Sequence, residues 1–441
     1  MPLHQQNTSK INMKILDRKI SRLSVASGIL AVLITIGLHL YSGSLLSANQ
    51  ASGFNAVTLF EQVWQTVNEH FYDPEFNGVN WSALREQYQP QVQQVNTREA
   101  AAAIINTMLA ELNTSHTRLY IPEEPAYYQL LGIFQPRSSD LQDQLQPFFP
   151  DGKITYPGIG IFTRTLDGET FVSGVLEGSP AAAAGLQVGD RIVSVAGRPF
   201  HPIQSFDHGT NRVEMVIQRT ASQDSLQTLT VAPKQFEATT MFLDAQIAST
   251  EVIEQQNRRI GYMHLWSYAG DQYQQQLEDE LLYGRLKDVD AFVLDLRGGW
   301  GGASPTVLNF FTGRGPSITN IVPRQNLRAT TPSHWNKPVV MLVNQESRSA
   351  KEILAYAFQQ YKIGPVVGSR TAGAVVAGRP FLMPDGSALY VAVADVLLDG
   401  TQRLEGRGVV PDIPVSAVLP YAAGADPQRE QAIKTALQAS Q

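Results

Sequence analysis

Apolar residues recur with helical spacing in the segment from residue 55 to residue 125. One face of the run VTLFEQVWQTVNEHF collects five apolar side chains, namely Leu59, Phe60, Val63, Trp64 and Val67. A second helix is predicted to begin after Thr97, whose hydroxyl can cap the run AAAAIINTMLAEL, and to end near Asn113. The pattern therefore predicts helices first, and then a loop of mixed character to about residue 150.

The apolar pattern changes after residue 150. Short strand-like pieces separated by turn signals predict a small β-rich domain over residues 153–235. Beyond it, GYMHLW, DAFVLDL and KPVVMLV are short apolar runs suited to buried strands. Helical segments are predicted between and after them, at about 272–286, 304–313 and 350–361. This alternation predicts an α/β domain over residues 236–420, and a short polar helix at 426–440 ends the chain.

Composition narrows the classes of protein that these elements can form. A chain of 441 residues is long enough for two or three domains. The net charge of −6, without a basic stripe beyond the N-terminus, argues against general nucleic-acid binding. The absence of cysteine excludes disulfide scaffolds, thiolate zinc sites and cysteine nucleophiles. The chain also lacks the His-Glu-x-x-His pattern of a zinc peptidase, so we expect no metal and no cofactor.

The first 50 residues have the pattern of an export segment. A basic flank that includes Lys10, Lys14 and Arg22 precedes the apolar run SVASGILAVLITIGLHLY and the small residues GSLLSA. This order predicts either a signal peptide, with cleavage after Ala48 as one option, or an uncleaved membrane anchor at residues 24–45. Either alternative places the rest of the chain on the exported side, periplasmic or luminal.

The segment at 174–200, GVLEGSPAAAAGLQVGDRIVSVAGRPF, resembles a PDZ domain. It has the turn Gly178-Ser179-Pro180, a short alanine helix, and Gly189-Asp190 leading into a strand. The resemblance implies that YPGIGIF upstream carries the carboxylate-binding loop, formed by Gly158, Ile159, Gly160 and Ile161. Glycines let backbone N–H groups turn toward a chain terminus, and a free strand edge can accept a peptide. The alternative is that GIGI only begins a strand.

Two further segments carry a resemblance to the S41 peptidase family, which includes C-terminal processing and tricorn-like proteases. The first, VLDLRGGWGGASP at 293–305, is a strand that runs into a glycine-rich turn, and the family's Asp-x-Arg is matched by Asp295 and Arg297. Backbone N–H groups at such a turn suit an oxyanion, and the resemblance implies Gly301 and Gly302 for that role. The implied fold is an α/β core of the ClpP/crotonase type with an N-terminal helical segment and an inserted PDZ domain.

The second segment is VNQESRSAKEILAYAFQQY at 343–361. The family nucleophile stands at a helix start in a Ser-Ala-x-Glu context, which implies Ser349 as nucleophile and the Ala350 amide as an oxyanion donor. Ser347 is a rival nucleophile. Ser349 with Glu352 also has the spacing of a capping box, so a purely structural serine is the alternative reading.

The general base separates two branches of the family. The processing-protease branch uses a lysine after Val-Gly-x-x-Thr-x-Gly, but here VVGSRTAG is followed by Ala374. Lys351 lies two residues from Ser349 on the same helix and would point elsewhere. A Ser-Lys dyad is therefore not supported.

The tricorn-like branch uses a Ser-His pair and a late glutamate. Ser115-His116 and Glu405 match this set in type and order. The resemblance implies that His116 deprotonates Ser349 and later protonates the leaving amine, with Ser115 and Glu405 in support.

Two functions follow from these segments. The first is a serine endopeptidase that cleaves unfolded or C-terminally recognised proteins outside the cytoplasm, with protein or peptide substrates bound through their C-termini. The second is a catalytically inactive PDZ-bearing binding protein on a peptidase core, which the missing lysine at Ala374 favours. A carrier of apolar small molecules is a more remote variant of the second function. The chain is predicted to divide into five parts. They are the export segment (1–50), the N-terminal helical part (55–130), the PDZ-like domain (153–235), the α/β catalytic core (236–420) and a C-terminal tail helix (421–441).

Overall fold

The computed structural model describes residues 54–441 except 208, 210 and 326. The export segment predicted over residues 1–50 therefore lies outside the described residues. In the described part of the chain, no helix combines the length and the apolar character that a membrane crossing requires.

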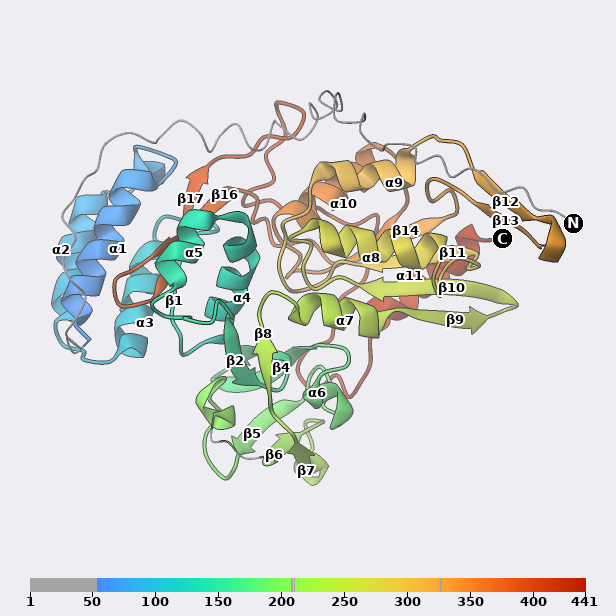
Figure 1. The fold of residues 1–441 in the computed structure, drawn as a ribbon. Helices are drawn as coiled ribbons and strands as arrows, with labels where there is room; N and C mark the ends of the chain where they lie inside the picture. The colour runs from blue at the N-terminus through green and yellow to red at the C-terminus, as the bar shows by residue number, and fades with distance from the viewer. Residues whose placement is uncertain (1–53, 208, 210, 326) are drawn as a thin grey trace, which may run out of the picture. The chain divides into compact units, whose positions relative to one another are not determined.

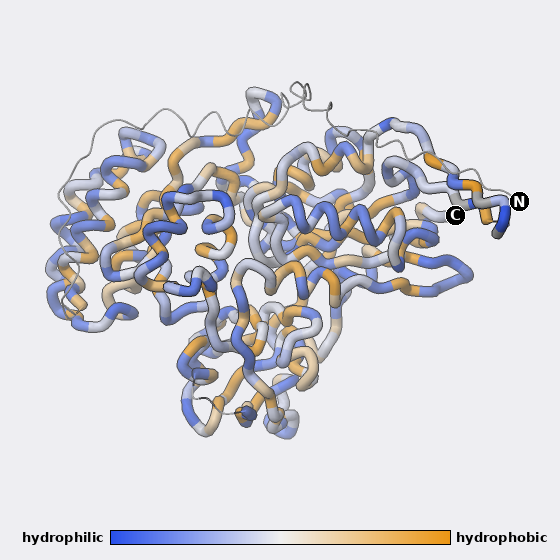
Figure 2. The backbone as a smooth tube through the Cα atoms, in the orientation of Figure 1, coloured by the Kyte–Doolittle hydropathy of each residue, from blue (hydrophilic) through white to orange (hydrophobic). Residues whose placement is uncertain are grey.

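Three capped helices open the described chain. Asn55, Asn80 and Thr97 each accept a hydrogen bond from a backbone N–H of the first turn that follows. The helices are α1 (Ala56–His70), α2 (Trp81–Val92) and α3 (Arg98–Ala110). In Figure 2 they alternate hydrophobic and hydrophilic residues along each turn, as amphipathic helices do. The predicted apolar face is buried at Leu59, Phe60, Val63 and Val67.

The predicted loop from residue 114 to 150 is wrong, because this stretch contains a strand and two helices. They are β1 (Arg118–Tyr120), α4 (Pro125–Phe134) and α5 (Ser139–Leu145). Pro125 stands at the first turn of α4, and Ser138 caps α5. Helices this short show too few apolar repeats for the pattern to be recognised.

A three-stranded antiparallel sheet joins these helices to a distant part of the chain. Its order is β1-β17-β16, with β16 at Ala377–Leu382 and β17 at Ala388–Ala394. Alternate residues of β17 face opposite sides: Leu389 and Val391 pack with the N-terminal helices, whereas Ala388 and Tyr390 pack with α4 and α5. The sheet is therefore covered on both faces.

A five-stranded antiparallel sheet forms the middle of the chain. Its order is β3-β4-β5-β6-β7, at Ile161–Leu166, Glu169–Val175, Arg191–Val195, Val213–Gln218 and Leu226–Val231. The short helix α6 (Pro180–Ala183) is capped by Ser179. The strand β2 (Thr155–Gly158) pairs with β8 (Lys234–Glu237), so entry to and exit from this segment lie side by side (Figure 1).

The last part of the chain is built on a six-stranded sheet. Its order is β18-β15-β14-β11-β10-β9, parallel except for the edge strand β9. In this order the strands span Ile413–Pro414, Val366–Gly368, Val339–Val343, Ala291–Asp295, Arg258–His264 and Glu251–Gln255. The helices are α7 (Met241–Ser249), α8 (Asp271–Leu282), α9 (Asn309–Thr312), α10 (Ala350–Gln360) and α11 (Pro427–Ala439). The three predicted buried strands correspond to β10, β11 and β14.

Helices cover both faces of this sheet. Phe292 and Leu294 of β11 pack in the cluster that contains α7, α8 and α10, whereas Ala291 and Val293 pack with α11. Both faces are buried, which explains the uninterrupted apolar runs. The helix predicted as polar, α11, buries Ala432, Ile433 and Ala436 against the sheet, because small residues hide its apolar stripe from a hydrophobicity count.

Between the second and the third predicted apolar runs, which form β11 and β14, the prediction was incomplete. The helix predicted at 304–313 is a 3₁₀ turn (Pro305–Leu308) followed by the one-turn α9. An antiparallel hairpin follows, with β12 at Ile318–Val322 and β13 at Leu327–Thr331. The expected domain boundaries themselves stay predictions.

Candidate active site

Ser349 stands at the start of α10 in a strained backbone conformation. Its φ of 58° and ψ of −131° lie in a region that side-chain-bearing residues rarely adopt. Its amide donates to Ala374 O at 2.8 Å and to Glu352 Oε2 at 3.2 Å. Strain of this kind persists only where surrounding contacts hold it, and it is concentrated at functional sites.

Glu352 holds the loop that lies against Ser349. Its buried carboxylate accepts from Thr371 Oγ1 at 2.5 Å, Gly373 N at 2.7 Å and Ala374 N at 2.8 Å. Burial raises the pKa of Glu352, while these hydrogen bonds oppose the shift. Ala374, which stands where the family resemblance implied a lysine in the processing-protease branch, thus lies beside Ser349.

The rival serine has a structural role. Ser347 is fully buried, its hydroxyl donates to Leu296 O at 2.9 Å, and the same oxygen accepts from Asn344 N at 3.0 Å. These bonds tie the loop before α10 to the end of β11. Ser347 Oγ is therefore committed to the backbone.

A hydrogen-bond relay orients His116. Ser115 Oγ donates to Glu405 Oε2 at 2.9 Å, and His116 Nδ1 lies 3.0 Å from Ser115 Oγ. The single hydroxyl hydrogen goes to the carboxylate, so the imidazole must donate through Nδ1, which leaves the Nε2 lone pair free to accept a proton. Glu405 is fixed in turn by Ser115 N at 2.8 Å and Val375 N at 2.6 Å.

Ser349 and His116 line one cavity. Its volume is about 610 Å³, and its walls also include Ser115, Gly301, Gly302, Ala374 and Tyr390. Among the described residues, no hydrogen bond joins Ser349 Oγ to His116. In a free enzyme such a bond commonly forms only with substrate present. The structure therefore brings the predicted nucleophile and base to the same cavity without closing their contact.

The glycine-rich turn after β11 lies directly against Ser349. A methyl group on Gly301 would come within 2.7 Å of Ser349 Cβ and 3.0 Å of Ala350 N, so only glycine fits there. Among the described residues, no acceptor faces the amides of Gly301, Gly302 and Ala350. Unpaired N–H groups beside Ser349 are what the predicted oxyanion site requires.

A buried lysine, Lys351, holds the glycine-rich turn through hydrogen bonds to backbone carbonyls. The sequence assigned it no role. Lys351 Nζ donates to Leu265 O at 2.6 Å, Gly298 O at 2.8 Å and Trp266 O at 3.2 Å. Burial lowers the pKa of Lys351 to about 7. The available sequence signal was its place on the apolar face of α10, three residues before Leu354. Its ammonium group is directed to backbone carbonyls and not to Ser349.

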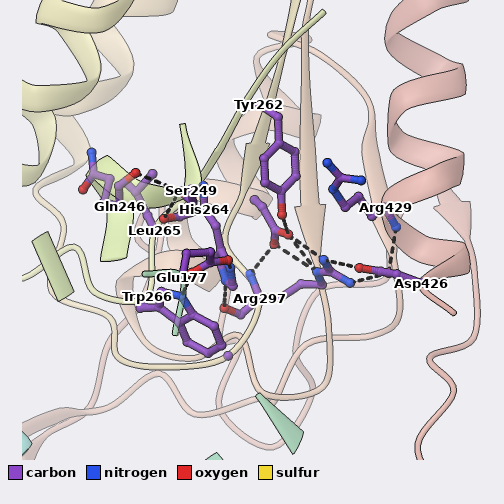
Figure 3. Close-up of polar contacts among 12 residues, drawn as sticks. Glu177, Gln246, Ser249, Tyr262, His264, Leu265, Trp266, Arg297, Asp426 and Arg429 are labelled. Atoms are coloured by element: carbon purple, nitrogen blue, oxygen red, sulfur yellow. Dashed lines mark hydrogen bonds and ion pairs between the residues drawn. The ribbon is translucent and has the colours of Figure 1, made fainter. Parts of the chain in front are cut away.

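Asp295 and Arg297 form a buried ion pair at the end of β11. Asp295 accepts from Arg297 Nη2 at 2.7 Å and from Tyr262 OH at 2.7 Å, and Arg297 Nη1 donates to Asp426 at 2.7 Å (Figure 3). Burial alone would raise the pKa of Asp295, but the Arg297 charge brings it well below its usual value. The pair fixes the strand end from which the glycine-rich turn departs.

The loop expected to bind a carboxylate lines a second cavity. Gly158, Ile159, Gly160 and Ile161 border about 380 Å³. The strand β3 that follows is an edge of its sheet. The two cavities share the wall residues Arg118, Tyr120, Trp300 and Arg348.

Glu177 links the five-stranded sheet to the turn that carries the oxyanion donors. It accepts from Trp266 Nε1 at 2.6 Å and lies 2.9 Å from His264 Nδ1, while His264 Nε2 lies 3.0 Å from Arg297 O (Figure 3). Both ring nitrogens of His264 face acceptors, so the protonated ring fits best. Burial would lower the pKa of His264, but the charges of Asp295 and Glu177 raise it.

Comparison with known proteins identifies the chain. Residues 259–415 match the family model "Peptidase family S41", residues 57–110 match "Tricorn protease C1 domain", and residues 171–219 match "PDZ domain". The chain carries an S41 peptidase core with a PDZ domain. The predicted resemblance is confirmed.

Relatives agree with this assignment. Over 396 residues the chain is 27% identical to the carboxyl-terminal-processing protease of Synechocystis sp., covering 87% of this chain and 86% of that one. It is 26% identical to the putative tricorn protease homolog 2 of Streptomyces coelicolor, covering 86% of this chain but 32% of that one. The crystal structure of the tricorn protease matches 88% of this chain and 37% of its own, with 16% identity and a TM-score of 0.51. The predicted fold class is confirmed.

The backbone strain at Ser349 predicts a stability difference between two variants of this residue. Ser349→Gly should be more stable than Ser349→Ala by about 1 kcal/mol, because glycine adopts a positive φ without a steric cost. Urea unfolding of both variants measures the difference. As a control, Ala103→Gly on the exposed side of α3 should lose about 1 kcal/mol. A Ser349→Gly variant less stable than Ser349→Ala would contradict the strain.

The partly buried position of His116, the predicted general base, predicts an unusual acid limit for activity. Burial, and secondarily the Arg348 charge, lower the pKa of His116 to about 4. A base must be neutral to accept a proton, so activity is present above this pKa and lost as pH falls through it. We expect kcat/KM to fall tenfold per pH unit below about pH 4. An acid limit near pH 6.5, with the fold intact by circular dichroism, would contradict this.

Proposed function

We propose that this chain is a serine endopeptidase in which Ser349 is the nucleophile and His116 the general base. The observation that carries the proposal is the Glu405–Ser115–His116 relay, which ends in the cavity that Ser349 borders. The relay leaves His116 Nε2 as the only ring nitrogen that can take a proton. Ala374 offers no alternative base, so the tricorn-like set replaces the Ser-Lys dyad.

The steps follow from these positions. His116 Nε2 removes the proton of Ser349 Oγ as the oxygen attacks the peptide carbonyl carbon. The amides of Gly301 and Ala350 bind the resulting oxyanion, with Gly302 beside them. His116 then gives its proton to the leaving amine as the peptide C–N bond breaks. In the second half, His116 takes a proton from the water that attacks the acyl-enzyme and gives it to Ser349 Oγ as the ester bond breaks. Glu405 stabilises the imidazolium through the Ser115 hydroxyl.

The PDZ domain supplies the substrate class in this proposal. Gly158–Ile161 and the free edge of β3 would bind an unfolded C-terminus by strand addition. The relative in Synechocystis sp. is called a carboxyl-terminal-processing protease, which supports the same class. Binding of an apolar peptide with a free C-terminus should exceed binding of its amide. We further propose that residues 1–50 direct export, so that the rest of the chain lies on the exported side of a membrane.

Mass spectrometry of an unfolded test protein tests the proposal. After incubation with the full-length chain we expect fragments, and labelling of Ser349 by a fluorophosphonate. Ser349→Ala should abolish both, while Ser347→Ala, provided that it folds, should keep both. If the wild-type chain neither cuts nor reacts but binds C-terminal peptides, the inactive binding protein replaces the peptidase.

A further inference from the structure

The catalytic cavity has an unusual balance of charged residues. Its walls contain three arginines, Arg118, Arg137 and Arg348, and neither aspartate nor glutamate. Arg118 is neutralised, because its Nη2 lies 2.7 Å from Glu124 Oε2. The positive charge of the cavity therefore rests mainly on the other two, of which Arg137 is exposed to solvent.

Arg348 is the partly buried one, and it immediately precedes the nucleophile. Among the described residues, no carboxylate lies within ion-pair distance of its guanidinium. The nearest acidic residue in sequence, Glu346, accepts instead from Arg164 of β3 at 2.5 Å. Arg348 keeps only a long hydrogen bond from Nε to Glu346 O at 3.4 Å.

The charge of Arg348 affects the pKa values of two neighbouring groups. It contributes to lowering the pKa of His116 and that of Lys351. A guanidinium that is partly removed from water and has no counter-ion gains most from a planar anion that accepts two parallel hydrogen bonds. Arg348 also stands on the wall that the catalytic cavity shares with the cavity of the carboxylate-binding loop. A peptide that passes from one cavity to the other meets this side chain beside the scissile bond.

We propose that Arg348 binds a carboxylate of the substrate next to the bond that is cut. The proposal rests on the proposed peptidase function and adds a specificity that the motif residues do not carry. The carboxylate comes either from an aspartate or glutamate side chain or from a chain end within a few residues of the scissile bond. Both sources present the same planar anion to the guanidinium.

Peptides of one sequence separate the two sources. One set carries Glu or Gln at each position within three residues of the scissile bond, always with an amidated C-terminus. The other set ends at those positions as free acid or amide. We expect a carboxylate at one position to raise kcat/KM about tenfold or more over its neutral analogue, the usual gain from a charge-assisted hydrogen bond. The set that shows the preference identifies the source.

Substitution of Arg348 tests the assignment. Arg348→Gln should reduce the acid-to-neutral ratio to about one while neutral peptides are still cut, and Arg348→Lys should retain part of the ratio because it keeps the charge without the fork. Arg370→Gln removes an exposed arginine that borders neither cavity, and its ratio should equal that of the wild type. A wild-type ratio of one, or a ratio that Arg348→Gln leaves unchanged, would overturn the proposal.

Failure of the two proposals can be told apart. Anisotropy measures binding of the amidated Glu and Gln peptides to Ser349→Ala without any cleavage. A preference for Glu that is lost in the Ser349→Ala, Arg348→Gln double variant supports carboxylate binding even if the wild type cuts nothing. If Ser349→Ala binds the Glu and Gln peptides equally well, the proposal that Arg348 binds a substrate carboxylate is overturned, whether or not peptides are cut.

Discussion

His116→Ala is expected to lower kcat/KM by about 10⁴-fold or more, because it removes both proton transfers of the proposed mechanism. Steady-state cleavage of a fluorogenic peptide measures the loss. His70→Ala is the matched control, since His70 is exposed on α1 and lies outside the cavity, and it should retain wild-type rates. A loss of less than tenfold in His116→Ala would show that another group takes the proton of Ser349.

Asp295→Ala is expected to lower the free energy of unfolding by about 3 kcal/mol, because it removes the fully buried carboxylate that pairs with Arg297 and leaves this partly buried guanidinium with Asp426 alone. Urea unfolding followed by fluorescence measures the change. Arg297→Met should lower the free energy of unfolding by a comparable amount, since it removes the positive charge that pairs with the buried Asp295 carboxylate.

The matched control for the buried pair is an ion pair at the surface. Asp395 lies 2.9 Å from Arg403, and both side chains keep about a third of their exposure. Water and salt screen such a pair, so Asp395→Asn should change stability by less than about 1 kcal/mol. Equal losses from Asp295→Ala and Asp395→Asn would mean that Asp295 contributes no more than a surface charge.

The sequence predicted best where one local pattern determined the structure. The strands β10, β11 and β14 were recognised because burial on both faces requires unbroken apolar runs. The apolar face of α1 and the Thr97 cap of α3 were also predicted from local patterns. Ser349, His116 and Glu405 could be predicted as site residues only through the order of their motifs, since a lone serine at a helix start is more often a cap, and their roles stay predictions.

The sequence did not predict features that depend on distant partners. β1 has three residues and exists because it pairs with β17, whose residues lie far along the chain. Short helices such as α5 are held by packing, not by their own periodicity. The sequence predicted only that Lys351 would point away from Ser349, and only the carbonyls of Leu265, Trp266 and Gly298 explain why its ammonium group is buried. The unpaired state of Arg348 likewise depends on Arg164, which takes the carboxylate of Glu346.

The relay between Ser115 and Glu405 joins two residues that are 290 positions apart in the chain. A ribosome produces Ser115, His116 and Ser349 before it reaches Glu405. Until then a nascent chain has a nucleophile and an imidazole, but nothing fixes the imidazole's tautomer. The growing polypeptide therefore cannot run the proposed chemistry on itself or on its neighbours. In the proposed mechanism, therefore, the tautomer of His116 is fixed only after Glu405 has been synthesised and has folded against Ser115.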